Sequence, residues 1–442
     1  MDGAEFRTRG REMVDYMVDY IEGITSRPPL PRVSPGYIRD LIPDQAPRTG
    51  ETWESVKADL ERIIMPGASS PACTELEVCM MDWLGKMLQL PREFLFCEEG
   101  KGGGVIQGTA SEATLVALLS ARTAAMHKLR DDQPELTQGQ ILDKLVAYTS
   151  EEAHSSVERA SLIGMVHMRL LKTDERGSLR GTTLETAIRE DREKGLYPFF
   201  LCATVGTTSR CTFDNLTELG PICTRQGLWM HVDAAYAGSA CICPEFRYLL
   251  DGVEHSMSFN FNPHKWLRIN FDCSAMWVKD RYAVTEAFEV NPLYLKHDHQ
   301  GQAIPDYRHW HIPLGRRFRS LKVWFVLRMF GVSGLQQQIR KDVSLAKMFE
   351  RLVQADDRFE IFGEVVLGLV CFRIKGENAR NERLYKMIND DRRIHLTPSK
   401  VKDIYFLRFA ICASSTQMAD VTYAWSVIKE LAHKMAASEK RQ

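Results

Sequence analysis

The sequence lacks both an apolar run long enough to span a membrane and an excess of charge of one sign. Its 442 residues include 57 lysines and arginines against 58 aspartates and glutamates, a formal net charge of −1. Such a balance gives no general argument for binding nucleic acid or an anionic membrane surface. The first ten residues carry too many charges for a signal peptide. We therefore expect a cytosolic protein whose function resides in a local site.

Paired cysteines at metal or redox spacing are also missing. The chain has eleven cysteines, several within apolar runs, and the nearest pair, Cys241 and Cys243, lacks CxxC spacing. Free thiols in a reducing compartment are the expected state. The histidine pairs at 297–299 and 309–311 have no HExxH motif or carboxylate at useful spacing, so no metal is expected. Walker and GxGxxG motifs are absent, which disfavours a nucleotide-dependent enzyme.

The N-terminal part is predicted to be helical. Residues 4–25 form an amphipathic pattern that must cover a surface, either of its own domain or of a partner subunit. The proline-rich segment 28–35 cannot be a regular helix and is expected to be an extended arm. A further helix is predicted over 74–90, with Thr74 as cap and Glu77 completing a capping box.

Between residue 100 and about residue 280, apolar strands alternate with helices. The predicted strands are 105–107, 145–148, 166–171, 199–205, 229–232, 257–261 and 275–278, and the predicted helices are 111–129, 155–164, 182–194 and 214–226. This alternation is typical of an α/β fold with a mostly parallel sheet covered on both faces. Ligands of such sheets bind beyond the carboxyl ends of the strands.

The C-terminal part is predicted to be a small α+β domain that follows a histidine- and glycine-rich loop, 291–312. Its predicted helices are 317–331, 334–353, 380–389 and 416–437, and its predicted strands are 359–363, 367–374 and 404–412. We expect an N-terminal helical arm (1–67), a large domain (68–330) and a small domain (331–442). Arg408 is buried by pattern and should find an acid, either structural or on a substrate.

Lys265 and Asp233 are the centre of the expected site. Each follows a strand-like apolar run, and the spacing between them suits neighbouring parallel strands. A lysine and an acid so placed can hold a flat heteroaromatic cofactor, with the acid on a pyridine nitrogen and the lysine as a Schiff-base partner. That combination indicates pyridoxal phosphate. The alternative is a solvated lysine paired with a nearby acid.

Other strand ends supply polar residues that suit the same cofactor. Thr109 and Ser111 begin a helix after Gly102–Gly104, where free backbone N–H groups and hydroxyls can seat a phosphate. His154 opens a helix and could stack on a cofactor ring, act as an acid or base, or simply cap the helix. Thr207 and Thr208 could hydrogen-bond the cofactor or be ordinary strand-end threonines.

Four motifs carry a family resemblance: Ile-Gln-Gly-Thr-Ala-Ser-Glu-Ala at 106–113, Ala-His-Ser-Ser-Val-Glu-Arg at 153–159, His-Val-Asp-Ala-Ala-Tyr-Ala-Gly at 231–238 and Asn-Pro-His-Lys-Trp at 262–266. With them the chain resembles the group II pyridoxal-phosphate decarboxylases of fold type I, especially those that act on aromatic L-amino acids. The resemblance runs over nearly the whole chain. It implies that Lys265 holds the cofactor, Asp233 pairs with its pyridine nitrogen and His154 stacks on its ring. The remaining residues implied to line the cofactor are Ala110, Ser111, Thr208, Ala235, Asn262 and His264.

The resemblance also bears on the reaction and the substrate. Tyr294 matches the tyrosine that delivers a proton to the substrate Cα, which favours simple decarboxylation over aldehyde formation. Gly315 matches the aromatic decarboxylases, whereas histidine decarboxylases carry serine there. The expected reactions are therefore L-DOPA to dopamine and 5-hydroxytryptophan to serotonin, with His154 and Gly315 contacting the substrate. Histidine decarboxylation is a further alternative.

One departure from the family follows Met65-Pro66-Gly67. In the family this tripeptide leads into an aromatic-rich segment of several dozen residues that supplies much of the substrate pocket and reaches the partner subunit. Here Gly67 joins almost directly to Ala68-Ser-Ser-Pro71. The expected form is a homodimer. The two hypotheses are an active decarboxylase, or an impaired isoform that binds pyridoxal phosphate or pairs with full-length subunits.

Overall fold

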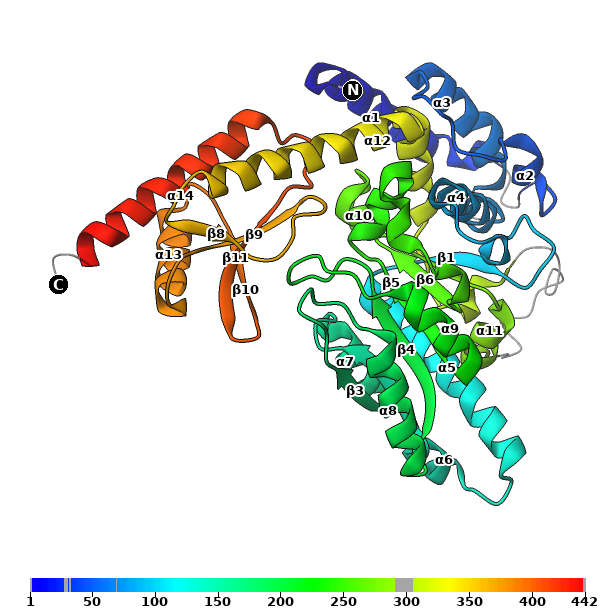
Figure 1. The fold of residues 1–442 in the computed structure, drawn as a ribbon. Coiled ribbons are helices and arrows are strands. Elements are labelled where there is room, and N and C mark those ends of the chain that lie inside the picture. Colours follow the sequence, from blue (N-terminus) through cyan, green and yellow to red (C-terminus); the bar gives the residue numbers. More distant parts are fainter. Residues whose placement is uncertain (1, 28–30, 32, 69, 291–304, 440–442) are drawn as a thin grey trace.

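The computed structural model describes residues 2–27, 31, 33–68, 70–290 and 305–439. The larger of its two sheets carries around it the helices α5 (Ala110–Asp132), α8 (Gly181–Glu193), α9 (Leu216–Gln226) and α11 (Arg281–Phe288) (Figure 1). This sheet has seven strands in the order β1-β7-β6-β5-β4-β2-β3. The strands are β1 (Gly103–Gln107), β2 (Leu145–Ser150), β3 (His167–Leu171), β4 (Tyr197–Thr204), β5 (Trp229–Asp233), β6 (Ser258–Phe261) and β7 (Ser274–Val278). All seven overlap predicted strands.

The direction of the strands brings the candidate residues to one edge. Strands β3, β2, β4, β5 and β6 are parallel, and β7 runs antiparallel to both β6 and β1. Strand β1 therefore points the same way as the parallel strands. The carboxyl ends of six strands meet at one edge of the sheet, which is where α/β sheets bind ligands. The predicted α/β fold is confirmed.

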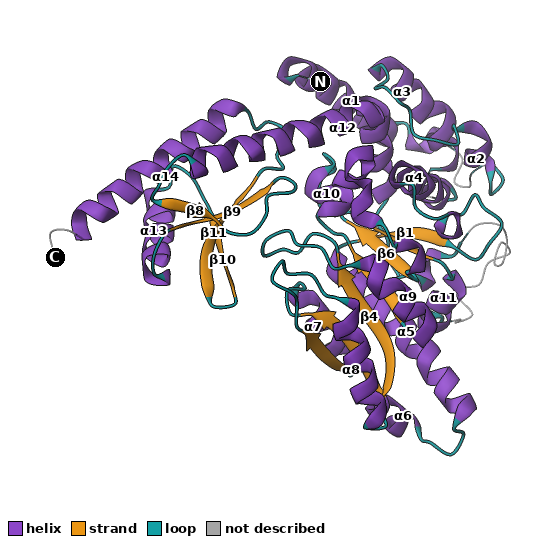
Figure 2. Ribbon diagram, in the orientation of Figure 1, coloured by secondary structure: helices purple, strands orange, loops and turns teal. Residues whose placement is uncertain are grey.

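The two faces of the sheet are covered by different helices (Figure 2). On β4, Leu201 and Ala203 belong to the cluster that includes α8 (Gly181–Glu193) and α9 (Leu216–Gln226). Phe200 and Cys202 face the other way, into the cluster of α5 (Ala110–Asp132), α7 (Ser155–Gly164) and α11 (Arg281–Phe288). Because both faces are buried, the strands are nearly continuous apolar runs. The short helix α6 (Gln138–Lys144) was not predicted.

The N-terminal helices are α1 (Gly3–Glu22), α2 (Tyr37–Leu41), α3 (Trp53–Asp59) and α4 (Ala72–Leu88). The predicted capping box at Thr74 is wrong, because α4 begins two residues earlier, after Pro71. Glu77 is instead buried, accepting hydrogen bonds from the Ile106 amide at 2.8 Å and from Arg316. The expected arm at 28–35 lies partly outside the described residues.

The C-terminal part begins on α12 (Arg319–Gln354), which a kink at Gly331 divides into two helical segments, as predicted. Gly331 interrupts this helix with a φ of 63°, and a Cβ there would lie 2.4 Å from the Thr49 carbonyl carbon. Only glycine suits both demands. Beyond it lies an antiparallel sheet in the order β10-β11-β9-β8, formed by β8 (Phe359–Ile361), β9 (Leu369–Ile374), β10 (Thr397–Val401) and β11 (Ile404–Ala410), with α13 (Asn378–Asp391) and α14 (Met418–Glu439). Strand β10 was not predicted.

Candidate active site

Lys265 lies in α10 (Pro263–Trp266), a single turn that follows β6. The Asn262 amide donates to the Ala235 carbonyl at 3.0 Å, which joins this turn to the residues after β5. Pro263 occupies the first helical position, where its missing N–H costs no hydrogen bond. The Lys265 amide then donates to the Asn262 carbonyl at 2.9 Å. The backbone at Lys265 is thus fixed by its own turn and by the neighbouring strand end.

Trp266 anchors the same turn through its ring and its indole N–H group. Its ring stacks on Tyr236 with centroids 5.1 Å apart and planes 6° apart. Its Nε1 donates to Asp342 Oδ2 on α12 at 2.8 Å. Burial raises the pKa of Asp342, and the hydrogen bonds from Gln338 and Trp266 lower it. The lysine turn is therefore tied to α12, the helix that leads into the C-terminal sheet.

The pKa of Lys265 is lowered. The largest cause is desolvation of its amine; the Asp233 carboxylate raises the pKa, and the Arg408 guanidinium lowers it. Asp233 is the last residue of β5 and is 4% exposed. Its Oδ1 accepts a hydrogen bond from the Ala235 amide at 3.0 Å. An amine that loses its proton more readily is a better nucleophile.

The polar residues near Asp233 on strands β5 and β6 do not neutralise its charge. His231 Nδ1 lies 2.8 Å from Ser258 Oγ, and its Nε2 lies 3.0 Å from Asn260 Oδ1. Burial lowers the pKa of His231 to about 4, so the ring is neutral at pH 7. A buried carboxylate needs a compensating positive charge. That charge must come from Lys265 or from a bound group.

The start of α5 presents free donors at the same edge. Thr109 caps this 23-residue helix by accepting from the Glu112 amide at 3.2 Å. Among the described residues, no hydrogen bond uses the amides of Ala110 and Ser111, and the Ser111 side chain is exposed. Backbone donors at a helix N-terminus, together with a hydroxyl, favour a phosphate group.

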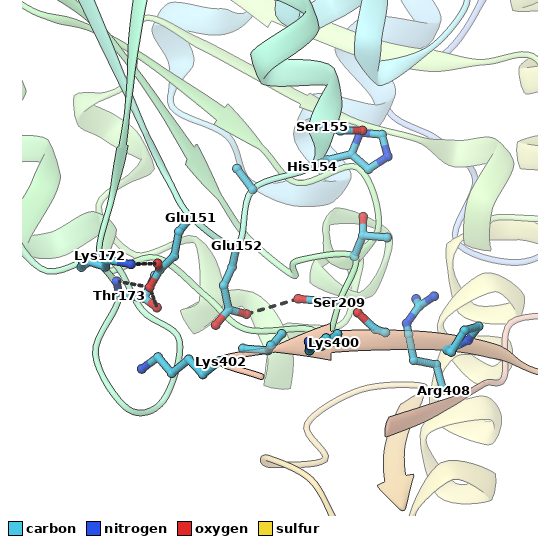
Figure 3. A pocket seen from close by; sticks show the side chains of 15 residues that line it. Glu151, Glu152, His154, Ser155, Lys172, Thr173, Ser209, Lys400, Lys402 and Arg408 are labelled. Carbon is cyan, nitrogen blue, oxygen red and sulfur yellow. Dashed lines mark hydrogen bonds and ion pairs between the residues drawn. The ribbon is translucent and has the colours of Figure 1, made fainter. Parts of the chain in front are cut away.

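His154 and Thr208 line a cavity of about 710 Å³. One wall consists of residues 151–155, 172–173 and 208–209, and the other of 398–402 and Arg408 from the C-terminal sheet (Figure 3). Lys265 and Asp233 are not among the lining residues. They lie at the ends of strands β6 and β5, and Arg408 connects the two regions through its effect on the Lys265 amine.

His154 caps α7, which is one of the three roles that the sequence left open for it. Its Nδ1 accepts from the Ser156 amide at 3.2 Å and lies 2.8 Å from Ser156 Oγ. Because Nδ1 accepts, Nε2 is the ring nitrogen that carries the N–H group. The exposed ring can therefore offer one N–H donor while it caps the helix.

Arg408 meets no structural acid among the described residues. It is half-buried, and its Nη1 donates to Thr397 Oγ1 at 3.2 Å. Its Nε is buried without a hydrogen-bond partner, and no carboxylate pairs with it in the part of the chain described. Of the two expected partners, a structural acid is not found among these residues, and a substrate acid stays a prediction for a guanidinium whose Nε is free.

The other predicted residues occupy varied places. Thr207 Oγ1 lies 2.8 Å from Thr212 Oγ1 and accepts from the Thr212 amide, so it stabilises its own loop. Asn262 is 2% exposed and its Oδ1 has no partner among the described residues, while Ala235 lies beside it. His264 Nδ1 accepts from the Cys273 amide at 2.8 Å, and burial lowers the pKa of this histidine.

Gly315 is exposed, and the space around it is open. Tyr294 and the histidine pair at 297–299 lie outside the described residues. Among the residues that are described, no group of three or more histidines, cysteines or acids could hold a metal ion. Nor is any helix in those ranges long and apolar enough to cross a membrane.

Sequence reasoning missed the buried pair Glu152–Arg210. The two residues are 58 positions apart, and each looks like an ordinary charged loop residue. Only their positions after neighbouring strands, β2 and β4, could have placed them together.

Comparison with known proteins gives the class of this arrangement. The model of the pyridoxal-dependent decarboxylase conserved domain matches residues 67–375. The chain therefore belongs to the pyridoxal-dependent decarboxylase family. Pyridoxal phosphate is the cofactor of this family.

Particular relatives can also be named. The aromatic-L-amino-acid decarboxylases of Rattus norvegicus and Mus musculus are each 55% identical to this chain, with 100% of both chains covered. The Manduca sexta aromatic-L-amino-acid decarboxylase is 52% identical over 97% of this chain and 92% of its own length. Among solved structures, Oryza sativa TDC with PLP and tryptamine has a TM-score of 0.79 at 35% identity, covering 98% of this chain and 99% of that one. Catharanthus roseus tryptophan decarboxylase with L-tryptophan has a TM-score of 0.77 at 37% identity and the same coverage.

The matches also show a shortfall in this chain. The comparison with the rat enzyme extends over 479 aligned positions, whereas this chain has 442 residues, a difference of 37. A deficit of this size suits the absence of the segment that follows the Met-Pro-Gly tripeptide in the family. In the structure, Met65–Gly67 forms a single turn, and α4 begins at Ala72.

The described residues fit the family's cofactor on three observations. The amides of Ala110 and Ser111 suit its phosphate, and buried Asp233 requires a positive partner such as a protonated pyridine nitrogen. The buried, unpartnered Oδ1 of Asn262 lies next to the lysine turn and requires a donor. Lys265 would hold the cofactor covalently.

Proposed function

We propose that this chain decarboxylates aromatic L-amino acids, with L-DOPA and 5-hydroxytryptophan as the favoured substrates. The observation that carries the proposal is Lys265, whose lowered pKa and position beside Asp233 suit covalent attachment of the cofactor. The names of the rat, mouse and Manduca sexta relatives support the substrate class. When bound, pyridoxal phosphate supplies an electron sink for the electron pair released as the carboxylate leaves.

The chain's own residues prepare that chemistry. Lys265 offers a neutral amine more readily than an ordinary lysine, because protein atoms and Arg408 disfavour its charged form. Asp233 would stabilise a proton on the pyridine nitrogen, which would preserve the electron-withdrawing power of the ring. Ala110, Ser111 and Thr208 would hold the phosphate end, and His154 would cover the ring.

Arg408 is suited to orient the substrate. Its guanidinium faces the cavity that His154 and Thr208 line, with Nε free of a partner. Arginine pairs with a carboxylate through two parallel hydrogen bonds, which fixes direction as well as position. The contact of Gly315 with the substrate stays a prediction from the family resemblance. The role of Tyr294 as proton donor to Cα stays a prediction from the family resemblance.

A homodimer is the proposed working form. Helix α1 buries none of its residues in this chain, and apolar side chains on it are exposed, including Phe6 at 69% and Ile21 at 66%. An amphipathic helix with an uncovered apolar stripe suits a second copy. The free state of the eleven cysteines supports a reducing compartment, the cytosol. The balanced charge favours neither nucleic acid nor membrane as a partner.

The test uses the purified 442-residue chain. We expect it to acquire the absorbance band of lysine-bound pyridoxal phosphate and to release carbon dioxide from L-DOPA and 5-hydroxytryptophan, but not from L-histidine. A band without release would reject the active enzyme and favour the impaired isoform. Release from L-histidine alone would reject the substrate class.

A further inference from the structure

A buried ion pair joins the two loops that carry His154 and Thr208. Glu152 follows β2 and precedes His154 by two residues, while Arg210 follows β4 and comes two residues after Thr208. Arg210 Nε donates to Glu152 Oε2 at 2.9 Å, and its Nη2 donates to Oε1 of the same carboxylate. The two side chains are only 7% and 3% exposed. The pair spans the gap between two neighbouring strand ends.

The paired hydrogen bonds make Glu152–Arg210 sensitive to the separation of the two loops. Two parallel hydrogen bonds between a planar guanidinium and a carboxylate fix both separation and orientation, which a lysine cannot do. Ser209 Oγ adds a third donor to Glu152 Oε2 at 3.2 Å. A buried charge pair adds little net stability, but removal of one partner leaves an uncompensated buried charge at considerable cost.

The pair also contacts the rest of the molecule on two sides. Gly177 closes over it so tightly that a Cβ there would lie 2.4 Å from Arg210 Nη2. On the other side, the Arg210 guanidinium lies 5.7 Å from the ring centre of Phe362, which follows β8. The Cys371 thiol on β9 donates to the Ser209 carbonyl at 3.6 Å. The Thr208 loop is thus held between the two sheets.

We propose that Glu152 and Arg210 are positioning residues that set the separation of His154 and Thr208 and make it depend on the seating of the C-terminal sheet. The catalytic consequence rests on the proposed function, whereas the geometric part does not. Glu152 borders the cavity (Figure 3), yet its carboxylate is occupied by Arg210 and Ser209. The pair acts on a ligand through the two loops.

The test compares Glu152→Gln, Glu152→Asp and Arg210→Lys with the unmodified full chain. Backbone hydrogen exchange, followed by mass spectrometry, should accelerate by about tenfold at 151–156 and 206–212, because a buried charge loses its matched partner. Because these loops carry His154 and Thr208, the dissociation constant of pyridoxal phosphate should also rise by about tenfold. Glu152→Asp and Arg210→Lys keep the charges but alter their reach or shape, so they should share the defect.

Glu51→Gln is the matched control. It breaks a second partly buried pair of the same two-pronged kind, Glu51–Arg328, which contacts α3 and α12 rather than the cavity. We expect it to leave exchange at 151–156 and 206–212 unchanged. Normal exchange and cofactor affinity in Glu152→Asp and Arg210→Lys would overturn the proposal, since charge alone would then suffice. Where Glu152→Gln does not fold, these two variants decide the outcome.

The readouts separate this proposal from the proposed function. If the unmodified chain releases no carbon dioxide while exchange responds as expected, the proposed function fails and the positioning role stands. If the unmodified chain is active and both loops of the variants exchange normally, the positioning role fails and the proposed function stands. Among variants that retain activity, an increase in KM larger than the loss in kcat would mark a defect of binding geometry.

Discussion

Two charges act on the Lys265 amine with opposite sign, and single substitutions should reveal both. Asp233→Asn removes the carboxylate that raises the pKa of Lys265, so the neutral amine should become more abundant at a fixed pH. Arg408→Gln removes the guanidinium that lowers this pKa, so the neutral amine should become scarcer. The double variant should return close to the unmodified chain.

The size of each effect follows from exposure. The Lys265 amine is partly desolvated, but the residue as a whole remains solvent-accessible, so water screens both interactions, and each is worth about 0.5–1 kcal/mol. That corresponds to about a two- to fivefold change in the fraction of neutral amine. A fully desolvated pair would give a far larger change.

The assay labels the cofactor-free chain with a small amine-reactive reagent between pH 6 and 9. Mass spectrometry then gives the labelling rate of Lys265 relative to Lys128, which is exposed near the far end of α5 and serves as internal reference. The rate should rise with Asp233→Asn and fall with Arg408→Gln. Rates that move in the same direction, or an unchanged rate in both variants, would refute the electrostatic account of this amine.

Further predictions address the cofactor, the lysine turn and pH. Lys265→Ala should abolish the absorbance band of bound pyridoxal phosphate; a band that survives would show that another amine holds the cofactor. Trp266→Phe should lower the free energy of unfolding by about 1–3 kcal/mol in urea, because buried Asp342 loses a donor; no loss would contradict that anchoring role. Burial raises the pKa of Asp214 to about 7, so the folded chain binds a proton that the unfolded chain releases near pH 4. This carboxyl should therefore reduce stability as pH rises from about 4 to 7, and Asp214→Asn should remove that part of the slope in urea midpoints, whereas an identical slope would refute it.

The sheet could be predicted because its strands are buried on both faces. Strands such as β4 and β5 are nearly continuous apolar runs, and helices separate most of them, so pattern and length decide the assignment. Strand β10 has no such signal: Thr397–Val401 contains a proline and a lysine and lies at the edge of the C-terminal sheet. The start of α4 differs from the prediction because Thr74 and Glu77 fit the capping-box pattern, whereas Pro71 is the N-cap residue.

The site could be predicted only in part. Residues at strand ends, such as Asp233, His154 and Lys265, are conspicuous because a polar residue follows an apolar run. The Glu152–Arg210 pair and the Trp266–Asp342 hydrogen bond depend on contacts between distant segments, which no local pattern records. Arg408 could be located, but whether an acid faced it depended on the packing of the C-terminal sheet. The division at residues 67 and 330 stays a prediction.

The antiparallel strand β7 has a consequence for the order in which the site forms. Strand β1 hydrogen-bonds within the sheet only to β7, from Gly103 opposite Val278 to Gln107 opposite Ser274. No other neighbouring strands of this sheet are separated by so much chain. On a ribosome, the Thr109–Ser111 seat would thus emerge early, yet its strand could join the sheet only after β7 has emerged. Contacts of long sequence separation form slowly because chain entropy must be lost first. The binding edge should consequently be among the last parts of the protein to mature, and a ligand that bridges this seat and Lys265 would stabilise the strand pairing completed last.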